Sequence, residues 1–240
     1  MTEETNAIRH HPSATVDEAI LSRRSIRAFL PDPVDDKTIR EILTLASRAP
    51  SGTNTQPWKV HIVRGAVRDQ LCDEIVAAFM AGDQYSEEYA YAPDPWDEPY
   101  LARRRATGWG LYGTLGIVKG DKDKMVAQHA RNFGFFDAPV GMFITIDREL
   151  ELGSWLDLGL FMQILMLAAR GRGLDTCPQQ AFAGFHKIIQ NRLSIPADEM
   201  VVCGLALGFA DMSAPENHFS PDREPVDMFA RFVDDLANSN

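Results

Sequence analysis

The spacing of apolar residues along the chain follows two periods, and each period predicts one kind of element. Residues three and four positions apart share one face of a helix, and Ile39, Ile42 and Ala46 show this spacing clearly. The same pattern predicts helices over residues 36–48, 67–79, 121–133, 154–170 and 227–236, and a short helix that begins at Thr15 and ends near the first arginines. Asp17 and Glu18 would lie in the first turn of the short helix, where the dipole favours acidic side chains.

Strand patterns are fewer than helix patterns. Trp58, Val60 and Ile62 alternate with polar residues, and this alternation places apolar side chains on one face of a strand. Two apolar runs, over residues 140–146 and 200–207, predict two further strands. The predicted class is therefore α+β, with a central, mostly antiparallel sheet flanked by helices. The order of the elements alone also permits a parallel α/β sheet.

Residues 82–120 differ in character from the rest of the chain. Their aromatic side chains are interleaved with acids, prolines and the run Arg103-Arg104-Arg105. We interpret this stretch as a lid-like excursion, because it is too short and polar to fold as a domain of its own. The chain has 240 residues, of which 45% are apolar. This is enough to bury one full core, and we predict a single domain over residues 15–240.

Charge and cysteine content exclude several classes of function. A net charge of −10 argues against a nucleic-acid partner, because neutralising phosphates needs a basic face. The three cysteines show no CxxC spacing, which indicates free thiols in a reducing compartment. The histidines have no spacing typical of a zinc hydrolase, and we predict no metal site.

No segment has the pattern of a targeting signal or a membrane span. Residues 1–11 are polar and lack the apolar core of a secretory signal. The apolar stretch over residues 155–169 is shorter than a bilayer requires and contains Asp157 and Gln163. We therefore predict a buried core helix there, no membrane partner and a cytoplasmic protein.

A cluster of arginines follows the first predicted helix, in the segment Arg23-Arg24-Ser25-Ile26-Arg27. Basic residues are common at the C-terminal end of a helix, where they face solvent. Alternatively, the cluster binds a phosphate, because guanidiniums recognise phosphates through paired hydrogen bonds. Arg223, near the end of the chain, would complete such a clamp if the two sites converge. Spacing alone leaves both interpretations open.

Two loops are further candidates for binding. The polar loop over residues 49–58 is either an ordinary helix-to-strand turn or a carrier of binding groups; its candidates are Pro50, Ser51, Gly52 and Asn54. The loop over residues 173–182 is either a plain connection or a ligand contact; its candidates are Pro178, Gln179 and Gln180. Cys177 has no base beside it in the sequence, so we predict a packed thiol there.

One motif matches a known binding pattern without its structural context. Gly108-Trp109-Gly110-Leu111-Tyr112-Gly113 matches GxGxxG, the dinucleotide-binding pattern. It follows no predicted strand, and no acidic residue stands about 20 positions later to bind a ribose. We therefore expect a false positive.

Taken in order, the arginine cluster and the two loops resemble the signature of the FMN-dependent nitroreductase family. The excursion, with its aromatics and triple arginine, is similar to the subgroup that reduces nitroaromatic compounds. The resemblance covers residues 18–227, nearly the whole chain. It implies a nitroreductase-like fold and an obligate homodimer of the domain-swapped type, with FMN sites at the interface and NADH or NADPH as electron donor.

The resemblance implies a role for each candidate residue. One subunit would hold the FMN phosphate and ring through Arg23, Arg24, Ser25, Arg27 and Arg223. Arg27 would lie near the N1 and C2 carbonyl edge, where a cation stabilises the reduced flavin. Many relatives carry a second basic residue where this chain has Pro221, so phosphate binding would depend more on Arg23 and Arg223.

The two loops would complete the cofactor site. The partner subunit would contribute Pro50, Ser51, Gly52 and Asn54. Pro178, Gln179 and Gln180 would cross the flavin face, with a backbone N–H near Gln180 directed at N5. Relatives often have an acid followed by glycine where this chain has Gln180 and Ala181, a change that keeps the backbone donor and removes a charge.

The excursion would contribute the substrate contacts. Tyr100, Trp109 or Tyr112 would stack on a flat aromatic substrate, and an arginine of the triple run would attract a carboxylate or nitro group. The alternative is an irregular surface segment whose aromatics pack into the core or the dimer interface.

The predicted function is NAD(P)H-dependent reduction of nitroaromatic compounds by a ping-pong reaction. Hydride from the nicotinamide would reduce FMN at N5, and the nitro group would then be reduced to nitroso and hydroxylamine products. The flavin carries the chemistry, so no side chain is predicted to be catalytic. Three alternatives remain: a quinone, flavin or azo reductase or a reductive dehalogenase on the same scaffold, a non-catalytic flavin-binding protein, or motifs that are structural and bind no flavin.

Overall fold

The protein is built around one antiparallel sheet. A computed structural model describes residues 9–233. The sheet has four strands in the order β1-β2-β4-β3, namely Lys59–Arg64, Val140–Asp147, Glu199–Gly208 and Asp175–Gln179. Every neighbouring pair is antiparallel. The predicted α+β class is therefore confirmed, and the parallel alternative is wrong.

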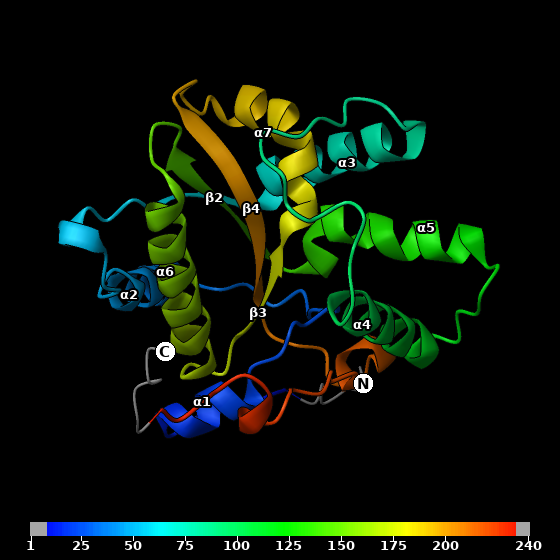
Figure 1. Ribbon diagram of the computed structural model, residues 1–240. Helices are drawn as coiled ribbons and strands as arrows, with labels where there is room; N and C mark the ends of the chain where they lie inside the picture. Colours follow the sequence, from blue (N-terminus) through cyan, green and yellow to red (C-terminus); the bar gives the residue numbers. More distant parts are fainter. Residues whose placement is uncertain (1–8, 234–240) are drawn as a thin grey trace, which may run out of the picture.

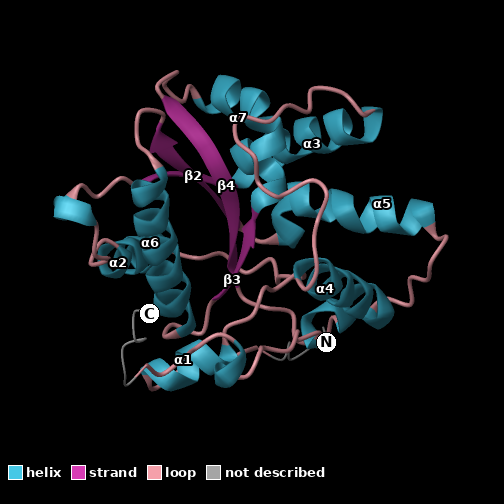
Figure 2. Cartoon of the chain, viewed as in Figure 1, coloured by secondary structure: helices cyan, strands magenta, loops and turns pink. Residues whose placement is uncertain are grey.

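The helices cover both faces of the sheet (Figure 1). Their bounds are α1 Val16–Ser22, α2 Asp36–Ala46, α3 Gly65–Ala81, α4 Tyr100–Thr114, α5 Lys122–Ala130, α6 Leu152–Arg170 and α7 His186–Leu193. Short 3₁₀ helices are η1 Gly52–Asn54, η2 Arg131–Asp137, η3 Gln180–Phe185, η4 Pro215–His218 and η5 Val226–Met228. In Figure 2, α2 and α6 lie on one side of the sheet and α3, α5 and α7 on the other.

The two central strands are the most buried elements. All ten residues of β4 are buried, and so are all residues of β2 except the last. Side chains alternate across a strand, so Met142 and Ile144 pack toward α2 and α6 while Phe143 packs toward α3 and α7. The continuous apolar runs seen in the sequence follow from helices covering both faces.

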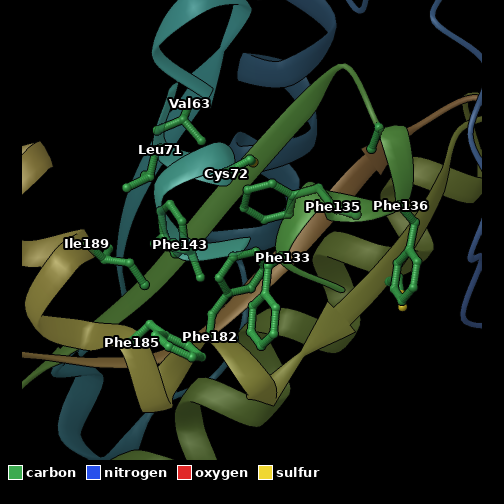
Figure 3. Close-up of a cluster of buried hydrophobic side chains, with 14 of the residues drawn as sticks. Val63, Leu71, Cys72, Phe133, Phe135, Phe136, Phe143, Phe182, Phe185 and Ile189 are labelled. Carbon is green, nitrogen blue, oxygen red and sulfur yellow. The ribbon is translucent and has the colours of Figure 1, made fainter. Parts of the chain in front are cut away.

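An aromatic cluster fills the side of the core that faces α3 and α7 (Figure 3). Phe182 stacks on Phe135 with ring centroids 4.5 Å apart, and it meets Phe143 edge-on at 5.2 Å. Phe135 and Phe136 have left-handed backbones, with φ of 52° and 54°. That conformation costs about 1–2 kcal/mol per residue. Burial of a phenylalanine contributes about 1.5–3 kcal/mol, which offsets the strain.

Local signals set the first two helix starts. Thr15 and Glu18 form a capping box at the start of α1, with the Glu18 backbone N–H donating to Thr15 Oγ1 at 3.1 Å. Asp35 caps α2 by accepting from the Thr38 backbone N–H at 2.8 Å. The predictions of a short helix from Thr15 and of a helix over residues 36–48 are confirmed within two residues at the ends.

Two element predictions need correction. The helix predicted over residues 227–236 is wrong for its described part, which has only the turn η5, while residues 234–236 lie outside the described residues. Phe229 and Phe232 there are 72% and 83% exposed, so this chain offers no surface on which an amphipathic helix could bury them. The helix predicted over residues 121–133 ends earlier and continues as η2. The excursion contains the regular helix α4, which the prediction of a lid-like excursion neither stated nor excluded.

The helix α6 is only partly a core helix. Leu158, Phe161 and Leu165 are buried against the sheet, but Leu152 and Leu156 on the opposite face are 82% and 69% exposed. Within residues 9–233, α6 is the one helix long and apolar enough to cross a bilayer by length and composition, and a third of its apolar window is buried. The core-helix prediction is therefore right for one face only.

Candidate functional site

The arginine cluster lies along strand β3. Ser25 forms a parallel bridge with Thr176, and the Ile26 backbone N–H donates to the Thr176 carbonyl at 3.1 Å. These contacts place the segment that follows α1 beside the strand that leads into the second predicted loop. Two of the three segments that carried the resemblance are thus adjacent in space.

The surroundings of Cys177 show that the arginine cluster and β3 are close together. Burial raises the pKa of its thiol to about 11, while Arg27, Arg23 and a hydrogen bond with Ser25 act in the opposite direction. The Cys177 side chain therefore faces the arginine cluster from β3. A thiol with this pKa is almost entirely protonated at neutral pH, which agrees with the prediction of a packed thiol and excludes a thiolate nucleophile.

Arg23 and Arg223 approach each other although they come from opposite ends of the chain. Burial lowers the pKa of Arg23, and the charge on Arg223 lowers it further. Neither guanidinium forms an ion pair with a carboxylate in the described part of the chain; Arg223 Nη1 donates to the carbonyls of Pro221 and Asp222 at 2.9 and 3.0 Å. Guanidiniums that have no acidic partner are available to bind an anion, so a phosphate clamp of Arg23 and Arg223 stays a prediction.

The other arginines of the cluster have structural contacts as well. Arg24 Nη1 donates to the Asn217 carbonyl at 3.3 Å, and Arg27 Nη1 donates to the Ser25 carbonyl at 3.2 Å. Among the four predicted arginines, which are Arg23, Arg24, Arg27 and Arg223, Arg23 alone has no side-chain hydrogen bond within residues 9–233. The solvent-facing interpretation thus fits Arg24 and Arg27 least, because both are half-buried and donate to backbone carbonyls, whereas Arg223 is exposed.

Asn217 organises the arginine segment, and sequence reasoning missed it. It is fully buried. Its Oδ1 accepts from the Arg27 backbone N–H at 2.7 Å, and its Nδ2 donates to the carbonyls of Ala28 and Asp211, both at 2.8 Å. A single asparagine in a short polar stretch gives no periodic signal, so only the fold reveals this role.

The loop with Pro50, Ser51, Gly52 and Asn54 is not brought to the arginine cluster of its own chain. It projects outward beyond α2 as the turn η1 (Figure 1). The Gly52 backbone N–H donates to Asp157 Oδ2 on α6 at 3.1 Å, and Ser51 Oγ accepts from the Gln56 backbone N–H at 3.0 Å. A role in the partner subunit's site stays a prediction.

Pro178, Gln179 and Gln180 line a cavity of about 460 Å³ at the end of β3. Six phenylalanines and tyrosines contribute to its wall, and we call it the aromatic pocket. Its further lining residues are Phe79, Tyr85, Glu87, Glu88, Tyr89, Tyr91, Arg104, His129, Asn132, Phe133, Ala181, Ala183, Gly184 and Phe185. Gln180 Nε2 donates to the Val202 carbonyl at 2.8 Å and Gln179 Nε2 to the Asn132 carbonyl at 2.6 Å. Gln179 Oε1 is buried with no partner among the described residues.

The predicted substrate residues lie elsewhere on the excursion. Tyr100, Trp109 and Tyr112 are on α4 and do not line the aromatic pocket; Trp109 and Tyr112 meet edge-on at 5.9 Å. Tyr85, Tyr89 and Tyr91, which precede α4, line it instead. These tyrosines are part of the same polar and aromatic stretch, which gave no signal to separate them from those on α4. Stacking of Tyr100, Trp109 or Tyr112 on a substrate stays a prediction.

A second cavity, of about 620 Å³, lies between α4 and the segment that carries Arg223. Arg103 Nε donates to Glu224 Oε1 across it at 2.9 Å. A Cβ added to Gly110 would lie 2.3 Å from the Phe219 ring, so this glycine lets the helix pack closely. Of the three glycines in the GxGxxG string, Gly110 therefore has a packing role, while a Cβ on Gly108 or Gly113 would meet nothing within 4 Å. Within residues 9–233 no cluster of histidine, cysteine and acidic residues could hold a metal.

The fold and the site define an α+β protein with an anion site beside an aromatic pocket. The chain belongs to the Nitroreductase family, whose family model matches residues 20–209. The predicted family is thus confirmed.

Relatives named for the reduction of nitroaromatic compounds are similar to the chain over nearly its whole length. It is 40% identical to the nitrobenzene nitroreductase of Ectopseudomonas oleovorans, over 92% of this chain and 98% of the relative. It is 41% identical to the 4-nitrobenzoate reductase of Pseudomonas putida, over 90% and 95%. The predicted resemblance to the nitroaromatic-reducing subgroup is confirmed by both.

Solved structures agree with the fold. The FMN and NADPH-dependent nitroreductase NfnB of Sphigopyxis sp. strain HMH matches with a TM-score of 0.88 and 34% identity, over 91% of this chain and 99% of the other. The FMN-dependent NfnB of Mycobacterium smegmatis, solved with NADPH, matches with a TM-score of 0.86 and 30% identity, over 90% and 97%. The predicted nitroreductase-like fold is confirmed.

Proposed function

We propose that this chain is an NAD(P)H-dependent FMN nitroreductase that reduces small nitroaromatic compounds. The observation that carries the proposal is that the arginine segment lies along β3, through the bridge between Ser25 and Thr176, and that β3 leads into the wall of the aromatic pocket. The nitroaromatic-reducing relatives and the FMN-dependent structures support the same activity.

The residues present fit FMN. The two guanidiniums supply an anion site for the phosphate, and Ser25 lies beside them through its bridge to β3. Gln179 Oε1 is a buried acceptor that lacks a donor, and a donor group of the ring system would satisfy it. Bound FMN supplies two-electron chemistry, receiving hydride from NADH or NADPH and delivering it to the nitro group in steps that lead to nitroso and hydroxylamine products.

The protein's own groups would bind the cofactor and orient it. Arg27 is held against Ser25 and Asn217, and a fixed cation there would stabilise negative charge on a reduced ring. The backbone around Gln180 is held in place by the bond from its side chain to Val202. No side chain needs to donate or accept a proton at the reacting atoms, so none is assigned a catalytic role.

The functional unit is a homodimer in the cytoplasm. Leu152, Leu156 and Leu160 form an exposed apolar stripe along α6, which a second copy would bury. The neighbouring loop with Pro50, Ser51, Gly52 and Asn54 would then reach the partner's cofactor. The three cysteines are buried and unpaired, as in a reducing compartment.

An anaerobic absorption spectrum tests the proposal. The purified protein should show flavin absorbance that bleaches with NADH or NADPH and returns when a nitroarene is added. Identifying the products with a nitroarene, a quinone and a halophenol would separate a nitroreductase from the other reductases. A yellow protein that is not bleached would indicate a flavin-binding module. A colourless protein that cannot be reconstituted with FMN would refute the proposal.

A further inference from the structure

Arg104 is the cation of the aromatic pocket. It lies on α4 and lines the pocket together with the tyrosines that precede that helix. Its guanidinium lies over the Trp96 ring, 5.5 Å from the ring centroid, within the range of a cation–π contact. Arg104 donates no hydrogen bond and forms no ion pair within residues 9–233, so its donors remain available to a ligand.

The neighbouring arginines are arranged differently. Arg103 is committed to Glu224, with Nε and Oε1 2.9 Å apart, and it borders the second cavity rather than the aromatic pocket. Arg105 lines neither of the two cavities. Of the triple run, only Arg104 therefore presents its charge to the aromatic pocket.

The acids of the pocket differ in how far they are neutralised. Glu88 is paired with Arg148 at 2.6 Å, and its other oxygen lies 3.2 Å from His186 Nδ1. Within residues 9–233, Glu87 accepts only from the Tyr85 hydroxyl, at 2.6 Å, and this neutral donor leaves the charge of Glu87 in place. The pocket thus has one uncompensated cation, Arg104, and one uncompensated anion, Glu87.

An aromatic pocket with a guanidinium suits a flat ring that bears a carboxylate. The aromatic walls receive the ring. A guanidinium binds a carboxylate through two parallel hydrogen bonds, which are stronger than its bonds to a neutral group. The whole protein has a net charge of −10, which disfavours anions at long range, so an anionic substrate needs such a local cation.

We propose that Arg104 makes this enzyme selective for nitroarenes that carry a carboxylate over neutral nitroarenes. The inference rests on the proposed function. The nitro group lies toward the end of the pocket formed by Pro178, Gln179 and Gln180, and the carboxylate lies toward Arg104. Glu87 opposes the selectivity, because it repels the same carboxylate.

Steady-state kinetics with 4-nitrobenzoate and nitrobenzene test the proposal. The measured quantity is the ratio of kcat/KM for 4-nitrobenzoate to kcat/KM for nitrobenzene. Arg104→Gln should lower this ratio about tenfold, which is about 1.4 kcal/mol, mainly through the KM for 4-nitrobenzoate. Arg104→Lys should restore part of it, because a charge remains without the paired geometry.

Two further variants test the direction of the charge effect and supply a control. Glu87→Gln should raise the ratio, the opposite of Arg104→Gln. Arg105→Gln changes the net charge and the same helix but not the pocket, so it should leave the ratio unchanged. Added salt should lower the wild-type ratio and leave that of Arg104→Gln nearly constant, since screening acts on the charged pair.

The possible failures are distinct. Equal changes for both substrates in Arg104→Gln, or the same loss in Arg105→Gln, would overturn the role of Arg104 while the nitroreductase activity stands. Wild-type protein that binds no FMN, or reduces neither compound, would overturn the proposed function and this inference with it. Because Glu87→Gln predicts a gain, a folding defect in one variant cannot be mistaken for support.

Discussion

The guanidiniums of Arg23 and Arg223 are close enough to influence each other electrostatically, and neither has an acidic partner in the part of the chain that the structure describes. The charge on Arg223 adds to burial in lowering the pKa of Arg23, which means that the pair repels in the free protein. An anion bound between them would remove the repulsion. Phosphate-bearing ligands should therefore stabilise the folded state in proportion to their occupancy.

Replacing Arg223 by alanine should weaken FMN binding and spare the fold. Charge-assisted hydrogen bonds contribute about 1.5–3 kcal/mol, so the Kd for FMN should rise about tenfold or more. The melting temperature of the FMN-free protein should stay the same or increase, because one repelling charge is gone. Calorimetric titration checks both, with the exposed Arg231→Ala as control. Equal FMN affinities for Arg223→Ala and the wild type would remove Arg223 from the phosphate site.

The sequence predicted the members of the anion site but not their support. Arg23, Arg24, Ser25 and Arg27 form a dense run that is visible at once. Asn217 is a lone polar residue, and its role depends on three partners that only the folded chain brings to it. Tyr85 and Tyr89 likewise could not be distinguished from the other aromatic residues of the excursion. They line the pocket because they precede α4, and the sequence did not show where that helix begins.

At the scale of elements, α4 is attached to the segment that carries Arg223. The contact depends on Gly110, where an added Cβ would be 2.3 Å from the Phe219 ring. An alanine in a helix is normally more stable than glycine by about 1 kcal/mol. Gly113→Ala meets no atom within 4 Å and should show that gain, whereas Gly110→Ala should lose it by displacing Phe219. Urea unfolding of both variants checks the difference in the free energy of unfolding. Equal stabilities would show that the contact between Gly110 and Phe219 does not stabilise the fold.

Glu199 links three strands through one carboxylate. It accepts from β2 at 2.6 Å and lies 2.9 and 3.2 Å from two donors of β1; these partners are Thr145, His61 and Lys59. Burial raises the pKa of Glu199, but the hydrogen bonds outweigh it and hold the pKa below the ordinary value of 4.5. The carboxylate therefore stabilises the fold above pH 4.5, and this stabilisation disappears as the pH falls through the lower pKa of the folded state.

Replacing Glu199 by glutamine should accordingly cost stability at neutral pH. The expected loss is about 1–3 kcal/mol at pH 7, and it should shrink at pH values below 4.5. Denaturant titrations across this range compare the Glu199→Gln variant with a control, Glu149→Gln. Glu149 is an exposed acid on the turn that follows β2. A constant difference between Glu199→Gln and the wild type at every pH would contradict the assignment.

Elements with a clear period were predicted, and elements without one were missed. The strands β2 and β4 stand out because both of their faces are buried. β3 was taken for a loop because Pro178 interrupts it, and proline is tolerated there because β3 is an edge strand. The helix α7 has only eight residues, too few for a periodic pattern to be distinguished from a loop.

At the scale of the whole molecule, the apolar stripe on α6 is one of the apolar surfaces that a single chain leaves exposed. Leu156→Glu should convert a dimer into monomers, because it places a charge in the centre of the proposed interface. FMN binding should fall with it, since the partner's loop would be lost. Sedimentation and FMN titration check this, with Met80→Glu on α3 as an equally exposed control. A Leu156→Glu protein that stays dimeric would place the interface elsewhere.

The sequence predicted the fold class and the family of the whole chain because three specific segments occur in order. The pairing of subunits was predicted from resemblance alone. The exposure of Leu152 and Leu156 is a property of the folded chain, because the sequence of α6 is apolar on all sides and does not show which face the sheet covers.

The distance along the chain between the parts of the anion site also sets when the site can exist. Arg24 and Asn217, which hold each other, are 193 positions apart. A ribosome extends the chain from the N-terminus at about 5–20 residues per second, so the arginine segment emerges many seconds before its partners. Cofactor capture must therefore wait until synthesis is nearly finished. A chain truncated before Asn217 would retain the sheet residues and the arginine cluster but would lack half of the anion site.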